Sequence, residues 1–197
     1  KHFIEQVQTS TARQETPLLY IAKSIEDEKR KVVEILESRT GLSDGIERIG
    51  LLLPSKSLLF DFVNFVKQAG LEIEIAGSTA SGMQLPSTFS NSVPKAMTYW
   101  SAKGLTFDTV ILPRLVKDAF HRKLPETRLK KLLFVGITRA TNWVYIGTEE
   151  GKEMSLLKMF LPLEKNGRLK VQSSSSIESI RESIQSSVKK DDLTSIL

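Results

Sequence analysis

The chain has 197 residues, of which 40% are hydrophobic and 26% are charged, and it has a formal net charge of +5 and a sequence pI near 9.4. This composition is ordinary for a globular domain with a real core. The chain has no cysteine and only two histidines, His2 and His121, which excludes disulfides and thiolate metal sites and argues against a histidine-based metal site. The basic balance mildly favours an anionic partner such as nucleic acid, and a basic surface kept for solubility explains it about equally well.

The sequence shows no membrane or secretion signal. No apolar run approaches the roughly 20 residues that span a bilayer, and Glu5 and Gln6 directly follow the first four residues where a signal peptide would need an apolar region. We therefore expect a cytoplasmic protein with no membrane partner. The first residue is Lys1 rather than Met, which suggests a piece cut from a longer protein.

Short apolar runs alternate with amphipathic stretches along the first part of the chain. The runs have the length of buried strands and are bounded by Pro or Gly. The stretches between them begin with Ser, a preferred helix N-cap, and stop at Gly, a preferred residue just past a helix end. The predicted strands are 17–22, 49–53 and 71–75, and the predicted helices begin at Ser24 and Ser55 and stop at Gly41 and Gly70. Strands and helices in this alternation predict βαβ units and a mostly parallel sheet.

Residues 77–94 interrupt this pattern. The segment is rich in Gly, Ser, Thr and Pro, which predicts a long loop, and loops of this length are usually functional, mobile or the remnant of an insertion. Residues 77–82 have the glycine spacing of a phosphate-binding P-loop, but Met83 and Gln84 stand where that motif needs Lys and Ser or Thr. No apolar strand ends in an acidic pair that would hold Mg²⁺. The chain therefore lacks the parts that grip a nucleoside triphosphate by themselves.

The second half of the chain continues the alternation. A helix is predicted to start near Pro125 and to carry Arg139 near its end, and a short amphipathic helix follows the last strand. The predicted strands are 95–100, 109–112 and 143–147, and the short helix is 154–161.

These patterns predict one domain with extensions at both ends. Residues 1–16 form an N-terminal extension, 17–165 form the α/β domain, and 166–197 form a Ser-rich linker and tail. The tail has apolar residues at helical spacing, which predicts either a helix that docks on a protein partner or a disordered segment. We favour a mobile tail unless a partner holds it. The apolar residues are Ile177, Ile180, Ile184 and Val188.

Lys103, Gly104 and Arg139 are candidate phosphate-binding residues. Lys103 and Gly104 lie between two predicted strands, where Gly permits a close backbone approach and Lys supplies a positive charge. An ordinary tight turn is the favoured interpretation on the local signal alone. Arg139 follows a helix with an apolar inner side, and it could stabilise charge during phosphoryl transfer as an arginine finger does. Locally, an Arg that interacts with the helix dipole is the more probable interpretation.

Thr98, Tyr99, Trp100 and Ser101 combine hydroxyl groups with aromatic faces at a predicted strand end. Such a set can donate hydrogen bonds to phosphates and stack on a base. For Trp100, filling of the core is an equally good interpretation before any comparison with a family.

Two longer stretches resemble a known family. Trp100–Asp108 (WSAKGLTFD) followed by Leu133–Ala140 (LFVGITRA) resembles motifs V and VI of superfamily 1 helicases of the UvrD, Rep and PcrA type. The two stretches occur in the right order, at the right separation and each in the right strand or helix context. The resemblance extends less specifically upstream and covers roughly Pro17 to Thr148.

The resemblance implies a RecA-like, P-loop NTPase-like α/β fold in three layers with a mostly parallel sheet, which would be the second motor domain of an ATP-dependent DNA helicase. ATP and Mg²⁺ would be held mainly by an N-terminal RecA-like domain outside this chain, so the isolated chain is expected to be inactive. Arg139 would reach the γ-phosphate, and Lys103 and Gly104 would lie beside the nucleotide. Thr98, Trp100 and Ser101 would face single-stranded or partly duplex DNA.

The sequence departs from the family at several positions. Thr106 stands where the family usually has a Glu that contacts the nucleotide sugar, so the resemblance leaves this contact open. Trp100 stands where His is common, and an aromatic stack could replace a polar contact. The loop after the second strand often carries Arg and Asn in relatives, where this chain has Pro54 and Lys56. Of these two residues, we assign Lys56 to DNA binding. The loop 77–94 stands where full helicases insert an accessory domain, which suggests a shorter motor.

Three alternative functions compete with the motor. The first is a helicase-like or polymerase-associated scaffold that has lost ATP turnover, and Thr106 and the missing insertion favour it slightly. The second is a basic nucleic-acid-binding domain without a motor, which predicts salt-sensitive binding by the isolated chain. The third is a nucleotide-binding enzyme of another RecA-like class, which the paired motifs disfavour.

Overall fold

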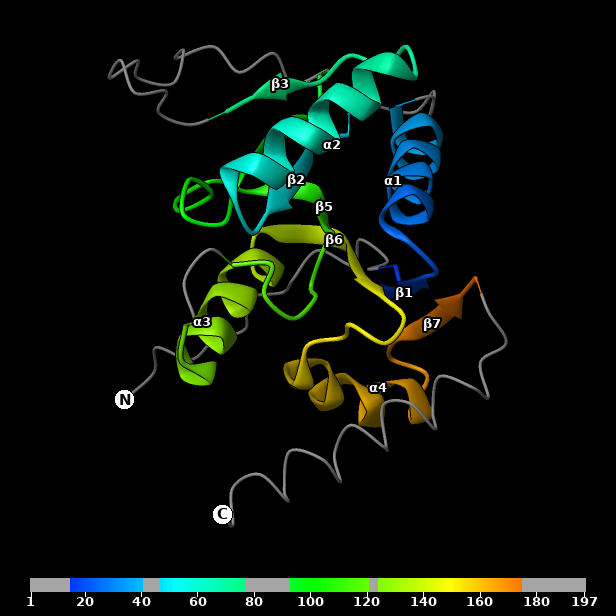
Figure 1. The fold of residues 1–197 in the computed structure, drawn as a ribbon, viewed down its shortest axis with the longest axis vertical. Coiled ribbons are helices and arrows are strands. Elements are labelled where there is room, and N and C mark those ends of the chain that lie inside the picture. Colours follow the sequence, from blue (N-terminus) through cyan, green and yellow to red (C-terminus); the bar gives the residue numbers. More distant parts are fainter. Residues whose placement is uncertain (1–14, 41–46, 77–92, 121–123, 175–197) are drawn as a thin grey trace, which may run out of the picture.

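The computed structural model describes residues 15–40, 47–76, 93–120 and 124–174. Within these residues, seven strands form one parallel sheet (Figure 1). The strand order is β3-β4-β2-β5-β6-β1-β7, and all neighbouring strands are parallel. The strands are β1 (Leu18–Ala22), β2 (Ile49–Leu53), β3 (Glu74–Ile75), β4 (Lys95–Thr98), β5 (Phe107–Leu112), β6 (Ala140–Glu149) and β7 (Lys170–Ser173). The predicted α/β fold with a mostly parallel sheet is confirmed.

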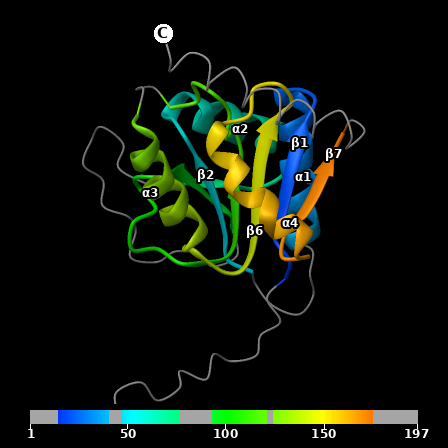
Figure 2. The same cartoon turned by 90° about the horizontal axis from the view of Figure 1, so that it is seen from below.

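Helices cover both faces of the sheet, so the domain has three layers (Figures 1 and 2). Helices α1 (Ile25–Thr40) and α2 (Lys56–Gln68) lie on one face. Helices α3 (Glu126–Ile137) and α4 (Leu161–Lys165) and the 3₁₀ helix η1 (Ser155–Phe160) belong to the other face. A separate apolar cluster fills each interface, because strand side chains alternate between the two faces. None of the helices in the described ranges has the length and apolarity that crossing a membrane requires.

The predicted helix caps are present. The Ser24 hydroxyl accepts a hydrogen bond from the backbone N–H of Asp27 at 3.2 Å, and the Ser55 hydroxyl accepts one from Leu58 at 3.3 Å. Gly70 follows α2 with φ +85, a conformation that suits Gly. The predicted stop at Gly41, the P-loop-like segment, most of the loop 77–94 and the tail from residue 175 lie outside the described residues.

Several element boundaries differ from the predictions. Strand β4 ends at Thr98, because the next residues enter tight turns, and the strand predicted at 71–75 pairs only at Glu74–Ile75. The predicted helix at 154–161 is a 3₁₀ helix that continues into α4. The sheet also extends beyond residue 165, the predicted end of the domain, because β7 pairs with β1. Its sequence, KVQS, has one apolar residue and therefore little strand signal.

A buried ionic cluster ties α1 to the carboxyl ends of β5 and β6. The Glu28 carboxylate is fully buried and accepts hydrogen bonds from the backbone N–H of Arg114 at 2.8 Å and from its guanidinium at 3.2 Å. The same guanidinium donates to Glu149 at 2.7 Å. Gly147 leaves room for this carboxylate, since a Cβ there would overlap Glu28 Oε1. Arg114 has φ +60, so the carboxylate stabilises a backbone turn that is unfavourable for Arg.

The cluster predicts a specific dependence of stability on pH. Burial raises the pKa of Glu28 from 4.5 to about 7, although Arg114 opposes the shift. The folded protein therefore binds this proton more tightly than the unfolded chain, and the contribution is full below about pH 4.5 and is lost as the pH rises through about 7. A shift of this size corresponds to a loss of about 3 kcal/mol in the free energy of unfolding.

Glu28→Gln should flatten the stability of the domain between pH 5 and 8, because Gln can accept the Arg114 hydrogen bond without ionising. Urea unfolding at a series of pH values measures this. Glu126→Gln on the exposed start of α3 is the control and should keep the wild-type slope. An unchanged slope in Glu28→Gln would show that Glu28 does not titrate in this range.

Candidate functional site

Residues 99–106 connect the carboxyl end of β4 to the amino end of β5. Because β4, β2 and β5 are parallel neighbours, this connection must run from one edge of the sheet to the other. Turns occupy residues 99–104, and Tyr99 and Ala102 are buried against the sheet, which anchors the connection. The predicted DNA-binding residues Trp100 and Ser101 therefore lie toward the β4 end of this connection, and the predicted ATP-binding residues Lys103, Gly104 and Thr106 lie toward its β5 end.

The part of the connection next to the carboxyl end of β4 carries an exposed aromatic ring that a second ring holds in place. Trp100 is 54% exposed and packs edge-on against Phe120, with 6.1 Å between ring centroids. Phe120 in turn contacts the buried ring of Tyr99 at 5.8 Å. The hydroxyl groups of Thr98 and Ser101 lie 3.2 Å apart beside it. The structure therefore brings the predicted DNA-binding residues of this segment together and leaves Trp100 outside the core.

A hollow of about 300 Å³ lies at the same edge, between the amino end of α2 and the segment after β5. Ser55 caps α2 there, and Lys56, its first residue, is exposed. Sequence reasoning missed this hollow and the basic residues that line it, Arg114 and Lys117. The sequence does show that both residues follow a buried strand. They can be placed beside the start of α2 only once β2 and β5 are known to be neighbours.

The part of the connection next to β5 carries the predicted phosphate-binding residues. Gly104 has φ +83, and nothing lies within 4 Å of the position a Cβ would take. Lys103 and Thr106 are exposed on either side of it. This turn is open, positively charged and free of side-chain obstruction at Gly104.

Arg139 lies against this turn. It follows α3 and is half-buried, and its guanidinium donates to the carbonyl of Leu105 at 3.2 Å, to the carbonyl of Val135 at 3.2 Å and to the hydroxyl of Thr138 at 3.4 Å. These acceptors are neutral, and within the described ranges no carboxylate forms an ion pair with Arg139. The Arg139 guanidinium therefore lies next to the Lys103–Gly104 turn. Neutral acceptors fix its position, and no carboxylate of the described residues neutralises its charge.

Known protein families and curated proteins give no match to the chain. Solved structures do match. The C-terminal domain of a possible DNA helicase from Lactobacillus plantarum has a TM-score of 0.60 and 16% identity, over 80% of this chain and 86% of that chain. Domain 2 of the DEAD-box helicase Mss116p, bound to an RNA duplex, has a TM-score of 0.52 and 11% identity, over 86% and 68%. The C-terminal domain of the DEAD-box protein Dbp5 has a TM-score of 0.50 and 15% identity, over 89% and 97%.

These similarities establish the fold. The chain has the α/β fold of C-terminal RecA-like helicase domains, with helices on both faces of a seven-stranded parallel sheet. At 11–16% identity, these similarities concern the fold of the chain.

The two Trp residues should differ sharply in their contribution to stability. Trp143 is 8% exposed, donates its indole N–H to the carbonyl of Thr16 at 3.0 Å and packs under the Arg39 guanidinium. Trp143→Ala should lower the free energy of unfolding by roughly 3–5 kcal/mol, and Trp100→Ala by less than about 1 kcal/mol. Urea unfolding followed by far-UV circular dichroism compares them. Similar losses would mean that Trp100 is a core residue.

Proposed function

We propose that the chain is the C-terminal motor domain of an ATP-dependent DNA helicase or translocase of the UvrD, Rep and PcrA type. The observation that carries the proposal is the unneutralised Arg139 guanidinium beside the Lys103–Gly104 turn, in the sequence contexts that resemble motifs VI and V. The fold of helicase C-terminal domains and the basic charge support it.

The residues at this turn fit a phosphate group. Two positive side chains, Lys103 and Arg139, flank a backbone segment that Gly104 leaves open, and phosphate is bound by such charges and close backbone approach. In contrast, the described residues contain no group of three or more acidic or His side chains that could hold a metal ion. We therefore assign Mg²⁺ and most of the grip on ATP to an N-terminal RecA-like domain.

ATP with Mg²⁺, bound between the two domains, would supply the phosphoryl transfer that drives the motor. Arg139 offers its free N–H groups to the charge that develops on the transferred phosphoryl group. Its hydrogen bonds to Leu105 and Val135 hold the guanidinium in place beforehand, so little reorganisation is needed. Lys103 would add positive charge, and Thr106, exposed in the same turn, would contribute a hydroxyl group to the nucleotide site. Without the other domain, the chain would not turn over ATP.

The opposite end of the connection would hold the DNA strand. Trp100 offers a face for base stacking, and the Thr98 and Ser101 hydroxyls and Lys56 offer hydrogen bonds and charge to the backbone phosphates. The hollow beside the capped start of α2 is lined by hydroxyl groups, by Lys117 and Asp118, and by Arg114, whose charge is already paired with Glu28 and Glu149. Cycles of domain closure and opening would move the strand across this surface.

Arg139→Ala should lower DNA-stimulated ATP turnover by about 10³-fold in the protein that carries both motor domains, because an arginine finger contributes at least that much. Arg128→Ala is the matched control, since Arg128 is exposed in the first turn of α3, at the end of the helix far from Arg139. Turnover is measured by phosphate release at saturating DNA. A near-normal rate in Arg139→Ala would remove the assignment.

Substitutions at the DNA surface should separate stacking from charge. Trp100→Ala should weaken binding of single-stranded DNA by roughly 1–3 kcal/mol without changing its salt dependence. Lys56→Ala should reduce the slope of log K against log salt by about 1. Lys67→Ala at the far end of α2 is the control and should change neither. Fluorescence anisotropy titrations with DNA and with RNA of the same sequence measure both quantities. Equal effects of all three variants would contradict this surface.

A further inference from the structure

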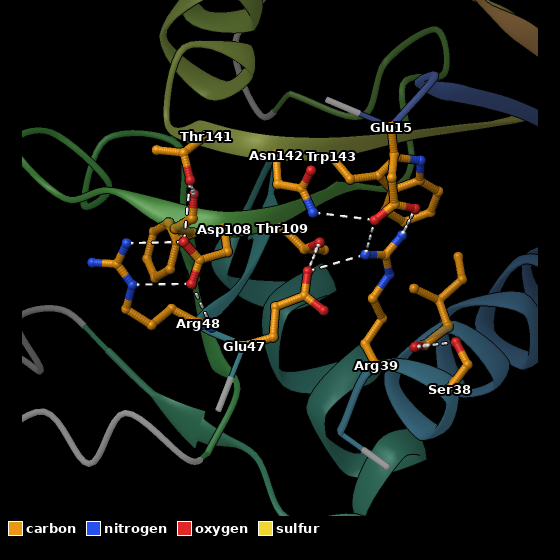
Figure 3. A network of polar contacts seen from close by, with 12 residues as sticks. Glu15, Ser38, Arg39, Glu47, Arg48, Asp108, Thr109, Thr141, Asn142 and Trp143 are labelled. Atoms are coloured by element: carbon orange, nitrogen blue, oxygen red, sulfur yellow. Dashed lines mark hydrogen bonds and ion pairs between the residues drawn. The ribbon is translucent and has the colours of Figure 1, made fainter. Parts of the chain in front are cut away.

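A polar network joins the amino ends of β2, β5 and β6, on the same sheet edge as Arg139 (Figure 3). At its centre, the Asp108 carboxylate accepts hydrogen bonds from Arg48 through the backbone N–H at 3.0 Å, Nε at 3.1 Å and a terminal guanidinium nitrogen at 3.0 Å. The Thr141 hydroxyl approaches the same carboxylate at 3.1 Å. The Arg48 guanidinium holds the pKa of Asp108 below its usual range, so the carboxylate is charged at neutral pH.

This network sits where the pairing of β5 with β6 shifts register. Phe107 pairs with Ala140, but the next paired residue, Thr109, lies opposite Trp143, so Asp108 stands at the irregularity. The Arg48 carbonyl accepts the backbone N–H groups of both Asp108 and Thr109, at 2.8 and 3.2 Å. Such irregularities redirect a strand end and often occur beside functional sites. The carboxylate therefore fixes a local deviation that ordinary sheet pairing would not maintain.

Phe107, the first residue of β5, connects this network to Arg139. Its ring lies directly over Gly50 of β2, where an added Cβ would come within 2.7 Å of the ring. Its backbone N–H donates to the carbonyl of Arg139 at 2.8 Å, and its carbonyl accepts from Thr141 at 3.2 Å. The backbone of Phe107 is thus bound directly to the backbone of Arg139, and the Arg139 guanidinium is bound to Leu105, two residues earlier.

We propose that Arg48, Asp108 and Thr141 form a clamp that positions Arg139 for ATP hydrolysis. The inference rests on the proposed function, because it assigns these residues to the same reaction. The clamp residues act as positioning residues: they hold the backbone segments at Phe107 and Thr141 that lie beside Arg139 and its Leu105 acceptor. The Arg48–Asp108 pair is partly exposed, with side-chain exposures of 44% and 30%, so it contributes little to global stability and its variants should fold.

The test is a double-mutant cycle in the protein that carries both motor domains. Asp108→Asn and Thr141→Val, each close in shape to the native residue, should lower kcat by roughly 10- to 100-fold with little change in the KM for ATP, because a misplaced catalytic group loses transition-state contacts. Affinity for single-stranded DNA should stay unchanged. Glu34→Gln, which removes an exposed ion pair of α1 on the opposite sheet face, is the control and should keep the wild-type kcat.

The decisive comparison repeats the clamp variants in the Arg139→Ala background. If the clamp acts through Arg139, the double variants should be no slower than Arg139→Ala alone. Additive losses, or clamp variants with wild-type kcat, would overturn the clamp and leave the arginine finger standing. Normal turnover of Arg139→Ala itself would overturn both the proposed function and the clamp, so the two failures are distinguishable.

Discussion

The packing of Tyr99 against Gly136 fixes how the end of α3 lies against the connection between β4 and β5. Tyr99 begins the connection between β4 and β5 and is almost fully buried, while Gly136 lies in the last turn of α3. A Cβ at Gly136 would come within 2.9 Å of the Tyr99 ring and 3.1 Å of Leu112. The missing side chain lets α3 approach the sheet closely, which is an established use of Gly where two elements meet. The end of α3, and with it Arg139, is therefore located by the same aromatic ring that anchors the connection.

The buried cluster of Glu28, Arg114 and Glu149 fixes the opposite sheet edge in a comparable way. A buried charge is unfavourable unless its partners satisfy it, and here one guanidinium serves two carboxylates while a backbone N–H serves one of them. The cluster holds the segment after β5, whose residues Val116 to Ala119 line the hollow next to α2. The shape of that hollow thus depends on ionic contacts with α1 and β6, and not only on the loop itself.

Much of the fold could be predicted from the sequence because its signals are local. The Ser caps at Ser24 and Ser55, the stop at Gly70 and the apolar runs each depend on a few neighbouring residues, and the structure shows them where they were expected. Strand β7 could not be predicted, because four mostly polar residues become a strand only by pairing with β1, far away in the sequence. The early end of β4 likewise depends on how Tyr99 packs rather than on the apolar pattern.

The residues of the candidate site that belong to sequence motifs could be predicted. The residues that come together only because their strands are neighbours could not. The resemblance pointed to Lys103, Gly104 and Arg139, and the structure brings Arg139 against that turn, although their role stays a prediction. The network around Asp108 depends on a register shift between β5 and β6, and a register cannot be read before the strand order is known. Arg48 belongs to yet another strand end, so no local pattern could have joined it to Asp108.

Under the proposed function, the two ends of the β4–β5 connection should move together. A short connection that two buried residues anchor cannot stretch or bend without displacing Tyr99 and Ala102 from the core, and close-packed interiors resist such displacement. Trp100 and Arg139 should therefore move together as parts of one rigid body when the nucleotide draws two motor domains together. In that view the domain does not transmit a signal through internal rearrangement. Under the proposed function, it would convert the binding of a phosphate at one sheet edge into a displacement of the strand-binding surface at the other.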